Sequence, residues 1–205
     1  MDFREAEEFL RRESDRLYVP RIDVEDGYVI YAVVSLYTLF RGGGVRVVDA
    51  GAGAGYSTLW IAWALEDVCV GGGCEVVAVE RFGDLLDIGR RVLNRIYMRR
   101  VEVKFVVDDA LSYIADLALE SIDIAFVDVD KHQYLEALKL LEEKLRVGGV
   151  AMFHNAYRPR PPPSFFNYIE TRRDRWSYTV IPTPMGILLA VKKSRTNHTD
   201  IPKQF

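Results

Sequence analysis

Residues 47–62 read VVDAGAGAGYSTLWIA, and their pattern indicates the fold that the chain is expected to adopt. A β-branched run at 45–50 leads into a glycine-rich turn, and a helical pattern starts at Tyr56. Glycines allow close backbone approach, and a helix N-terminus offers free N–H groups to a carboxylate or phosphate. The stretch therefore predicts the first strand, ligand-binding turn and helix of an open α/β sheet.

The rest of the chain repeats this alternation of strand and helix. Further short apolar runs are expected to form buried strands at 76–80, 101–107, 122–129 and 150–153. The helix between the last two carries an amphipathic stripe and is expected to end at Gly148 and Gly149. Such alternation predicts parallel strands with helices on both faces. Two later strands, 177–182 and 187–192, are joined by a Pro-Met-Gly turn and predict an antiparallel hairpin at one edge.

The expected fold class is α/β, a Rossmann-like, doubly wound and mostly parallel seven-stranded sheet with an antiparallel C-terminal hairpin and extra N-terminal helices. One domain is expected over 1–194, followed by a flexible tail at 195–205. Within this domain the N-terminal helices occupy 1–44 and the cofactor-binding core 45–155. The remaining part, 156–194, is expected to form a loop over the ligand site and the hairpin.

Composition and charge restrict the protein class and its location. A hydrophobic fraction of 49% with 28% charged residues excludes a disordered or fibrous chain. The net charge of -3 gives no reason to expect a nucleic-acid partner. The apolar run at 28–40 is too short to span a bilayer and predicts a buried helix, and the charged segment 1–13 does not resemble a secretory signal. We therefore expect a cytoplasmic protein with no membrane partner.

The two cysteines, Cys69 and Cys74, are too few for a disulfide framework. They are expected as buried thiols beside the turn Gly71–Gly73, in keeping with a reducing compartment, and a local disulfide is the less favoured alternative. The excess of arginine over lysine and the scarcity of glutamine favour a thermophile, although genomic base composition produces the same bias.

The spacing of the glycines restricts the cofactor. Gly51, Gly53 and Gly55 read G-x-G-x-G, whereas a dinucleotide fingerprint places its third small residue one position later, where this chain has Tyr56. The acid at the end of the second strand, Glu80, lies 29 residues beyond Gly51, and a dinucleotide site has it about 20 residues on. A carboxylate there can still accept both hydroxyls of a ribose. This pattern favours S-adenosylmethionine over a nicotinamide cofactor.

Four segments together resemble a known family: VVDAGAGAGYSTLWIA at 47–62, AVER at 78–81, DDALSYI at 108–114 and FVDVDKHQY at 126–134. Their order and sequence resemble the metal-dependent O-methyltransferases of the catechol and caffeoyl-CoA type, over about residues 26–155. The resemblance implies a class I enzyme that uses S-adenosylmethionine and methylates a hydroxyl of a small, aromatic acceptor. It also implies a homodimer, which the apolar N-terminal helices favour.

The resemblance also assigns a set of residues to the cofactor. This set is Asp49, Gly51, Gly53, Gly55, Tyr56, Ser57, Glu80, Arg81, Asp109, Ala110 and Asp128. It implies that Asp49 orients the glycine loop near the methionine amino group, and that Gly51, Tyr56 and Ser57 face the methionine carboxylate. Glu80 would hold the ribose.

Asp109 and Ala110 would lie along the adenine by the same resemblance. The family usually has glycine before this Asp, and this chain has Asp108 there. The loop is therefore a place where the local geometry is expected to depart from the family.

Methyl transfer from a sulfonium needs an acceptor oxygen that is close, in line and deprotonated. A divalent ion can hold and acidify the hydroxyl, and a lysine can take its proton or stabilise the oxyanion. The resemblance implies that Asp128 binds the metal and that Lys131 is the catalytic base. Lysine is disfavoured near a helix N-terminus, so its position there favours a functional role. Asp130 is expected to cap the helix that follows.

The remaining family ligands are an Asp-Asn pair, and this chain has His154-Asn155 there. Imidazole removes a negative charge and suits Mn²⁺, Fe²⁺ or Zn²⁺ better than Mg²⁺. Three interpretations stay open: a changed metal preference, a weakened site, or no metal and His154 as a second acid or base. The candidate metal ligands are Asp128, His154 and Asn155, for Mg²⁺, Mn²⁺ or Zn²⁺. The candidate catalytic residues are Lys131, Asp128 and His154.

The loop 156–166 departs from the family and contains Arg158, Arg160 and a run of prolines. Its arginines could meet an anionic acceptor, although a solvated basic loop is the commoner explanation. Tyr157 and Trp176 could stack on an aromatic acceptor, and core packing explains Trp176 equally well.

Other functions remain as alternatives. A methyltransferase acting on RNA or protein would use the same fold, and the basic cluster at 172–175 keeps this possible. A cofactor-binding homologue with a degenerate metal site is a second alternative, and a nicotinamide dehydrogenase is a third, which the glycine spacing disfavours.

Overall fold

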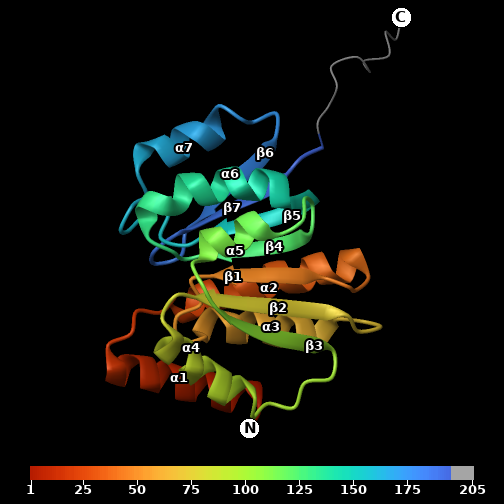
Figure 1. Cartoon of the computed structure of the whole chain (residues 1–205), viewed down its shortest axis with the longest axis vertical. Coiled ribbons are helices and arrows are strands. Elements are labelled where there is room, and N and C mark those ends of the chain that lie inside the picture. Colours follow the sequence, from red (N-terminus) through yellow and green to blue (C-terminus); the bar gives the residue numbers. More distant parts are fainter. Residues whose placement is uncertain (195–205) are drawn as a thin grey trace, which may run out of the picture.

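The structure is a computed structural model that describes residues 1–194, with a central sheet of seven strands (Figure 1). The strands are β1 (Arg46–Ala50), β2 (Cys74–Glu80), β3 (Val101–Val107), β4 (Ile122–Val127), β5 (Leu145–Phe153), β6 (Trp176–Ile181) and β7 (Ile187–Lys192). Their order is β3-β2-β1-β4-β5-β7-β6, with β1 to β5 parallel and β7 antiparallel to both of its neighbours. The predicted doubly wound sheet with an antiparallel hairpin at one edge is confirmed. The predicted tail at 195–205 lies outside the described residues.

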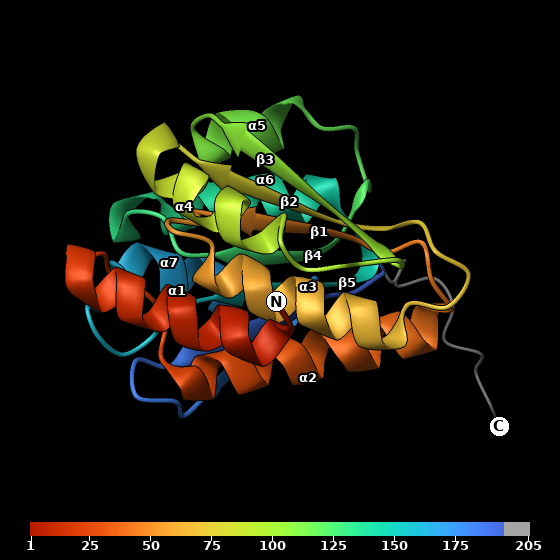
Figure 2. The same ribbon diagram turned by 90° about the horizontal axis from the view of Figure 1, so that it is seen from below.

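Helices cover both faces of the sheet. They are α1 (Phe3–Leu17), α2 (Val24–Arg41), α3 (Tyr56–Val68), α4 (Gly83–Leu93), α5 (Ala110–Asp116), the 3-10 turn η1 (Lys131–Gln133), α6 (Tyr134–Lys144) and α7 (Pro163–Glu170). Seen from below, α1, α2 and α3 lie on one side of the sheet and α5 and α6 on the other (Figure 2). Side chains alternate along a strand, so Val47 packs in the α1–α4 core and Val48 in the α5–α7 core.

Several predicted boundaries differ from the structure by one or two residues, and two were wrong by more. The helix expected to continue to Gly148 and Gly149 ends at Lys144, and β5 begins at Leu145 and includes both glycines. Leu145 is fully buried and fits the apolar pattern of either element, so periodicity alone placed it in the helix. The second error lies in the loop expected at 156–166, where α7 begins at Pro163. Proline fits the first turn of a helix because its missing N–H has no intrahelical partner there.

The prediction of two free, buried thiols was also wrong. Cys69 and Cys74 form a disulfide that joins the end of α3 to the start of β2. The bond closes the tight turn that contains Gly71–Gly73, at the opposite end of β2 from Glu80. The less favoured alternative, a local disulfide, is the one that the structure contains.

Replacing both cysteines by serine is expected to lower the free energy of unfolding by about 2 kcal/mol, because the bond closes a short loop and constrains the unfolded chain. Urea denaturation of the wild type with and without reductant, beside Cys69→Ser/Cys74→Ser, measures this loss. Reductant should not affect the double variant. Equal stability of the oxidised wild type and the double variant would contradict the expectation.

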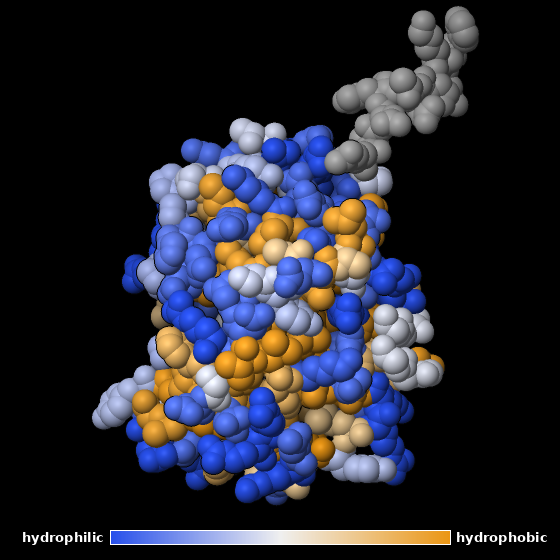
Figure 3. Space-filling view, in the orientation of Figure 1, coloured by the Kyte–Doolittle hydropathy of each residue, from blue (hydrophilic) through white to orange (hydrophobic). Residues whose placement is uncertain are grey.

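No helix within residues 1–194 is long and apolar enough to cross a membrane. The helix predicted at 28–40 corresponds to most of α2, which buries Ile30 and Val34 but leaves Leu36 and Phe40 exposed. Figure 3 shows hydrophobic side chains in separate patches among polar ones on the face that it draws. The prediction of a buried helix therefore holds for one side of α2 only.

Candidate functional site

A cavity of about 580 Å³ opens beyond the carboxyl ends of the parallel strands. This is the edge at which open α/β sheets bind ligands. Ten of the predicted site residues line it: Gly51, Gly53, Glu80, Arg81, Asp109, Ala110, Asp128, Lys131, His154 and Asn155. A small adjoining hollow is lined by Tyr56 and Ser57 as well as by the glycine loop. The structure thus brings together residues that lie as far apart in the chain as Gly51 and Asn155.

Asp49 anchors the glycine loop from beneath. Its Oδ2 accepts hydrogen bonds from Ser57 Oγ at 2.8 Å and Thr58 Oγ1 at 2.5 Å, so the end of β1 is tied to the first turn of α3. Its Oδ1 is buried and has no hydrogen-bond partner among the described residues. Burial raises the pKa of Asp49 to about 7, despite the two hydroxyl donors. This carboxylate therefore has one oxygen without a hydrogen bond, but Asp49 itself lines neither the cavity nor the adjoining hollow.

Glu80, at the end of β2, stabilises the same loop by hydrogen bonds. Its Oε2 accepts the backbone N–H of Gly53 and its Oε1 that of Phe82, each at 3.0 Å. The side chain also forms part of the cavity wall. A single carboxylate thus fixes the shape of the glycine loop and presents acceptors to a ligand.

The hydroxyl of Tyr56 points away from the main cavity. It donates to Glu7 on α1, and the ring lies 5.3 Å from the guanidinium carbon of Arg21. The hydroxyl of Ser57 donates to Asp49. The hydroxyls of both residues are therefore engaged by acidic side chains.

Two acids near the opening have different roles. Asp109 caps α5, because its Oδ1 accepts the backbone N–H groups of Leu111 and Ser112 at 3.0 Å each. Asp130 occupies the N-cap position of η1, as predicted. Its carboxylate makes no capping hydrogen bond and instead forms an ion pair with Arg81 at 3.1 Å. The end of β2 approaches this loop in space, which the local sequence does not show.

Lys131 begins η1, in the loop that follows β4, and its side chain is held on the cavity wall. Its Nζ donates to Asp128 Oδ1 at 2.6 Å and to the hydroxyl of Tyr134 at 2.8 Å. Tyr134 in turn donates to the backbone carbonyl of His154 at 2.9 Å. These contacts fix the ammonium at the end of the cavity where β4 and β5 meet.

His154 lies between two carboxylates. Its Nδ1 is 3.1 Å from Asp128 Oδ2, and its Nε2 is 3.0 Å from Asp26 Oδ2. Burial disfavours the charged ring, but the hydrogen bonds to Asp128 and Asp26 outweigh it and raise the pKa of His154 to about 9. The same bonds outweigh burial at both carboxyls and lower their pKa values. At neutral pH the ring is an imidazolium that donates from both nitrogens.

Sequence reasoning missed Asp26. It lies in the first turn of α2, is fully buried, and also accepts the backbone N–H of Asp23 at 3.0 Å. An Asp in the first turn of a helix usually serves the helix end, so nothing in the local sequence pointed to a partner 128 residues away.

The candidate metal ligands are not arranged as a metal site. A metal-binding imidazole must offer a ring nitrogen with a free lone pair, and both nitrogens of His154 face carboxylate oxygens within hydrogen-bond distance. The side-chain amide of Asn155 donates to the carbonyl of Arg158 at 2.6 Å. Within residues 1–194 no group of three or more His, Cys, Asp and Glu side chains is placed to hold an ion. As arranged, these residues do not fit a divalent cation.

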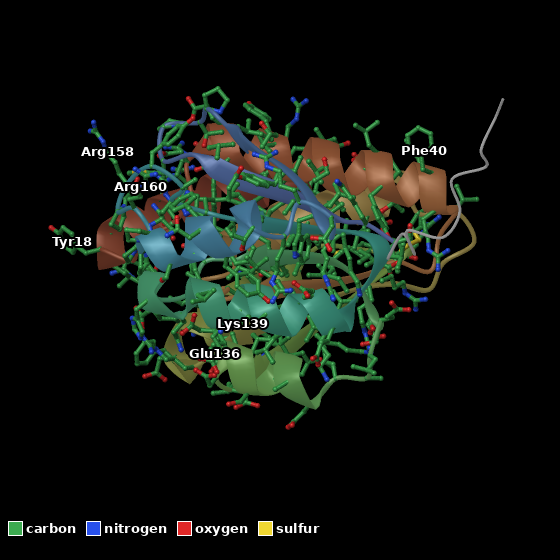
Figure 4. The ribbon with its side chains drawn as sticks, turned by 90° about the horizontal axis from the view of Figure 1, so that it is seen from above. Tyr18, Phe40, Glu136, Lys139, Arg158 and Arg160 are labelled. Atoms are coloured by element: carbon green, nitrogen blue, oxygen red, sulfur yellow. A yellow bond between two sulfur atoms is a disulfide. The ribbon has the colours of Figure 1, made fainter. Side chains whose placement is uncertain are left out.

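Neither arginine of the loop after β5 lines the cavity. Arg158 is exposed and points away from the molecule, and Arg160 lies over the ring of Phe166 at 4.8 Å (Figure 4). Figure 4 places both arginines at the same end as Tyr18 and far from Phe40. Trp176 is fully buried and its Nε1 donates to Glu142 at 3.2 Å, so core packing, the alternative explanation, accounts for it.

Comparisons with known proteins show the family to which the chain belongs. A family model described as "Methyltransferase domain" matches residues 48–156. A caffeoyl-CoA O-methyltransferase from Stellaria longipes is 28% identical over 115 residues, 54% of this chain and 45% of that protein. A flavonoid 3',5'-methyltransferase from Vitis vinifera is also 28% identical over 115 residues, 54% of this chain and 46% of that protein. The chain thus spans about half the length of the curated relatives that it matches.

Solved structures share the fold over nearly the whole chain. An O-methyltransferase from Bacillus cereus in complex with S-adenosylhomocysteine has a TM-score of 0.73 and 23% identity, covering 92% of this chain and 91% of that one. The resemblance to O-methyltransferases inferred from the four sequence segments is confirmed. Because the family model covers more than half of the chain, the protein belongs to the methyltransferase domain family.

Proposed function

We propose that this protein transfers a methyl group from S-adenosylmethionine to a hydroxyl of a small, aromatic acceptor, without a divalent metal. The observation that carries the proposal is the position of Lys131. Its Nζ, held by Asp128 and Tyr134, lies on the wall of the same cavity as the glycine loop. A proton acceptor beside a methionine-binding loop is what methyl transfer to oxygen needs.

The cofactor part of the proposal is supported by the cavity and by the family. The Bacillus cereus relative was solved with S-adenosylhomocysteine, and an O-methyltransferase from Streptomyces achromogenes of the same fold was solved with S-adenosylmethionine. In this chain Glu80 would accept the ribose hydroxyls, and Asp109 and Ala110 would lie beside the adenine. Asp49 Oδ1, buried without a partner, would accept the methionine ammonium.

The chemistry proceeds in a single displacement. The acceptor oxygen attacks the methyl carbon as the carbon–sulfur bond breaks, and S-adenosylhomocysteine leaves. The hydroxyl proton goes to Lys131, or, where the lysine is already charged, the ammonium stabilises the oxyanion. Asp128 positions Lys131, and His154 holds Asp128 from the other side. A charged imidazole would thus supply positive charge where the resembling enzymes place a metal.

The alternative of an RNA substrate has less support. Arg172 and Arg175 pair with Glu142, and Arg173 pairs with Glu170, so the basic cluster that kept this alternative possible is balanced by acids.

Calorimetric titration of S-adenosylhomocysteine into chelator-treated protein tests the cofactor, and labelled methyl transfer to catechol with and without EDTA tests the metal. We expect binding, and transfer that EDTA leaves unchanged within about twofold. Titration with Mn²⁺ should show no binding to the wild type, whereas His154→Asp, which restores the family's ligand pair, should gain it. Folded protein that does not bind S-adenosylhomocysteine overturns the function, and transfer that requires Mg²⁺, Mn²⁺ or Zn²⁺ overturns only the metal-free chemistry.

Cofactor binding is expected to strengthen as the pH rises through 7. The pKa of Asp49 is raised to about 7, so the free protein holds this proton below that pH. An ammonium is accepted only by the ionised carboxylate, so affinity should fall about tenfold per pH unit below 7 and level off above it. Calorimetry of S-adenosylhomocysteine from pH 5.5 to 8 measures the profile. Asp49→Asn should flatten it, and a flat wild-type profile would show that Asp49 does not take part.

We also infer a homodimer. Tyr28, Leu36, Leu39 and Phe40 form an exposed apolar stripe along α2, and such patches commonly mark protein interfaces. Light scattering on the wild type and on Leu36→Asp tests it: a monomeric wild type contradicts the inference.

A further inference from the structure

The connection between α1 and α2, residues 18–23, lies over the glycine loop and forms the roof of this end of the cavity. Val19, Pro20 and Arg21 line the main cavity, and Arg21 also lines the small hollow that contains Gly51, Tyr56 and Ser57. Arg21 is therefore the basic side chain that lies against the predicted methionine end of the site.

The guanidinium of Arg21 is held in place on several sides. Its NH2 group pairs with Asp15 at 3.1 Å, its NH1 group donates to the carbonyl of Ile22 at 3.2 Å, and its plane lies over the ring of Tyr56. Its Nε is buried and has no hydrogen-bond partner among the described residues. A buried donor without a partner costs free energy unless a ligand satisfies it.

Arg21 differs from the other cations of the cavity in the position of its acidic partner, because each of the others has a partner that lines the cavity and Arg21 does not. Arg81 pairs with Asp130, and Lys131 and His154 both contact Asp128. The partner of Arg21, Asp15, is a mostly exposed side chain on α1 and does not line the cavity. At this end of the cavity the positive charge of Arg21 is thus available to an anionic group.

The backbone N–H groups at the start of α3 can donate to the cofactor's carboxylate, but the side-chain hydroxyls beside them are engaged by acids, so Arg21 is the charged partner at this end of the cavity. Tyr56 donates to Glu7 and Ser57 donates to Asp49. Building on the proposed function, we propose that Arg21 binds the carboxylate of the methionine moiety of S-adenosylmethionine. Asp49 takes the ammonium from below the loop and Arg21 takes the carboxylate from above it.

Two ligands separate this role from a structural one. S-adenosylhomocysteine carries the carboxylate, and decarboxylated S-adenosylhomocysteine keeps the ammonium but lacks it. Removing a charge-assisted hydrogen bond typically weakens binding about 10- to 100-fold. Calorimetry should therefore show that Arg21→Gln weakens the binding of S-adenosylhomocysteine by this factor. The affinity for the decarboxylated ligand should stay within about twofold of that of the wild type.

Asp15→Asn is the matched control, because it removes the ion pair that holds Arg21 and keeps the guanidinium. We expect it to bind S-adenosylhomocysteine within about threefold of the wild type. If Asp15→Asn reproduces the loss seen in Arg21→Gln, or if Arg21→Gln weakens both ligands equally, Arg21 only supports the roof and the proposal is overturned. Unchanged binding in Arg21→Gln overturns it as well.

A second variant covers the case in which Arg21→Gln does not fold. Arg21→Lys keeps the positive charge, so it should still bind S-adenosylhomocysteine more tightly than the decarboxylated ligand. This preference should be smaller than in the wild type, and a preference as large as that of the wild type overturns the proposal. A wild type that binds neither ligand means instead that the proposed function has failed, so the two failures are distinguishable.

Discussion

Replacing Lys131 by methionine is expected to lower kcat about 10²- to 10⁴-fold and to change the affinity for S-adenosylhomocysteine by no more than about threefold. In the proposed function Lys131, on the cavity wall, receives the acceptor proton or stabilises the oxyanion, and both roles act on the attacking oxygen. Methionine keeps the length of the side chain, and Asp128 retains its contact with His154. The loss should therefore appear in catalysis rather than in cofactor binding.

Single-turnover transfer of a labelled methyl group, with calorimetry of S-adenosylhomocysteine on the same samples, measures both quantities. Lys139→Met is the matched control, because Lys139 lies on α6 away from the cavity and contacts the ring of Tyr168 (Figure 4). The control should keep the wild-type kcat. A Lys131→Met enzyme with kcat within threefold of the wild type would remove Lys131 from the chemistry.

Replacing Gly51 by alanine is expected to lower the free energy of unfolding by about 2–5 kcal/mol, from left-handed backbone strain and overpacking together. Gly51 has a φ of 89°, and a Cβ there would lie 2.5 Å from the backbone oxygen of Asp128. The loops after β1 and β4 approach so closely that one must move. Because Asp128 and Lys131 lie on the second loop, cofactor affinity and catalysis should both fall.

Gly53→Ala is the control for this loop. Gly53 also has a positive φ, 52°, but a Cβ there meets nothing within 4 Å. Its free energy of unfolding should fall by only about 1–2 kcal/mol, which is the cost of a left-handed backbone conformation for a residue with a Cβ. Urea denaturation of the two variants separates backbone strain from the steric clash with Asp128. Equal decreases in the free energy of unfolding would show that the clash does not contribute to the destabilisation.

Local patterns were sufficient to predict most of the framework. β-branched runs and amphipathic stripes gave the parallel strands and their helices, and the strands at 101–107 and 187–192 match the structure residue for residue. The spacing of the glycines identified the cofactor loop, and the family resemblance singled out Asp128 and Lys131, whose contact was not predicted. The boundary at Leu145 failed because an apolar residue at the junction fits either period.

The contacts that define the chemistry of the site depended on the tertiary structure. Asp26 and His154 are 128 residues apart and meet only because α2 packs near the end of β5. Three further features also depend on which elements become neighbours. They are the position of Arg21 over the glycine loop, the hydrogen bonds of the Tyr56 and Ser57 hydroxyls to acidic side chains, and the Cys69–Cys74 bond. The elements and the cofactor loop could be predicted from the sequence, because periodicity and spacing act over one or two turns or strands. Only the folded chain decided which charges face each other, because that depends on strand order and helix packing between distant segments.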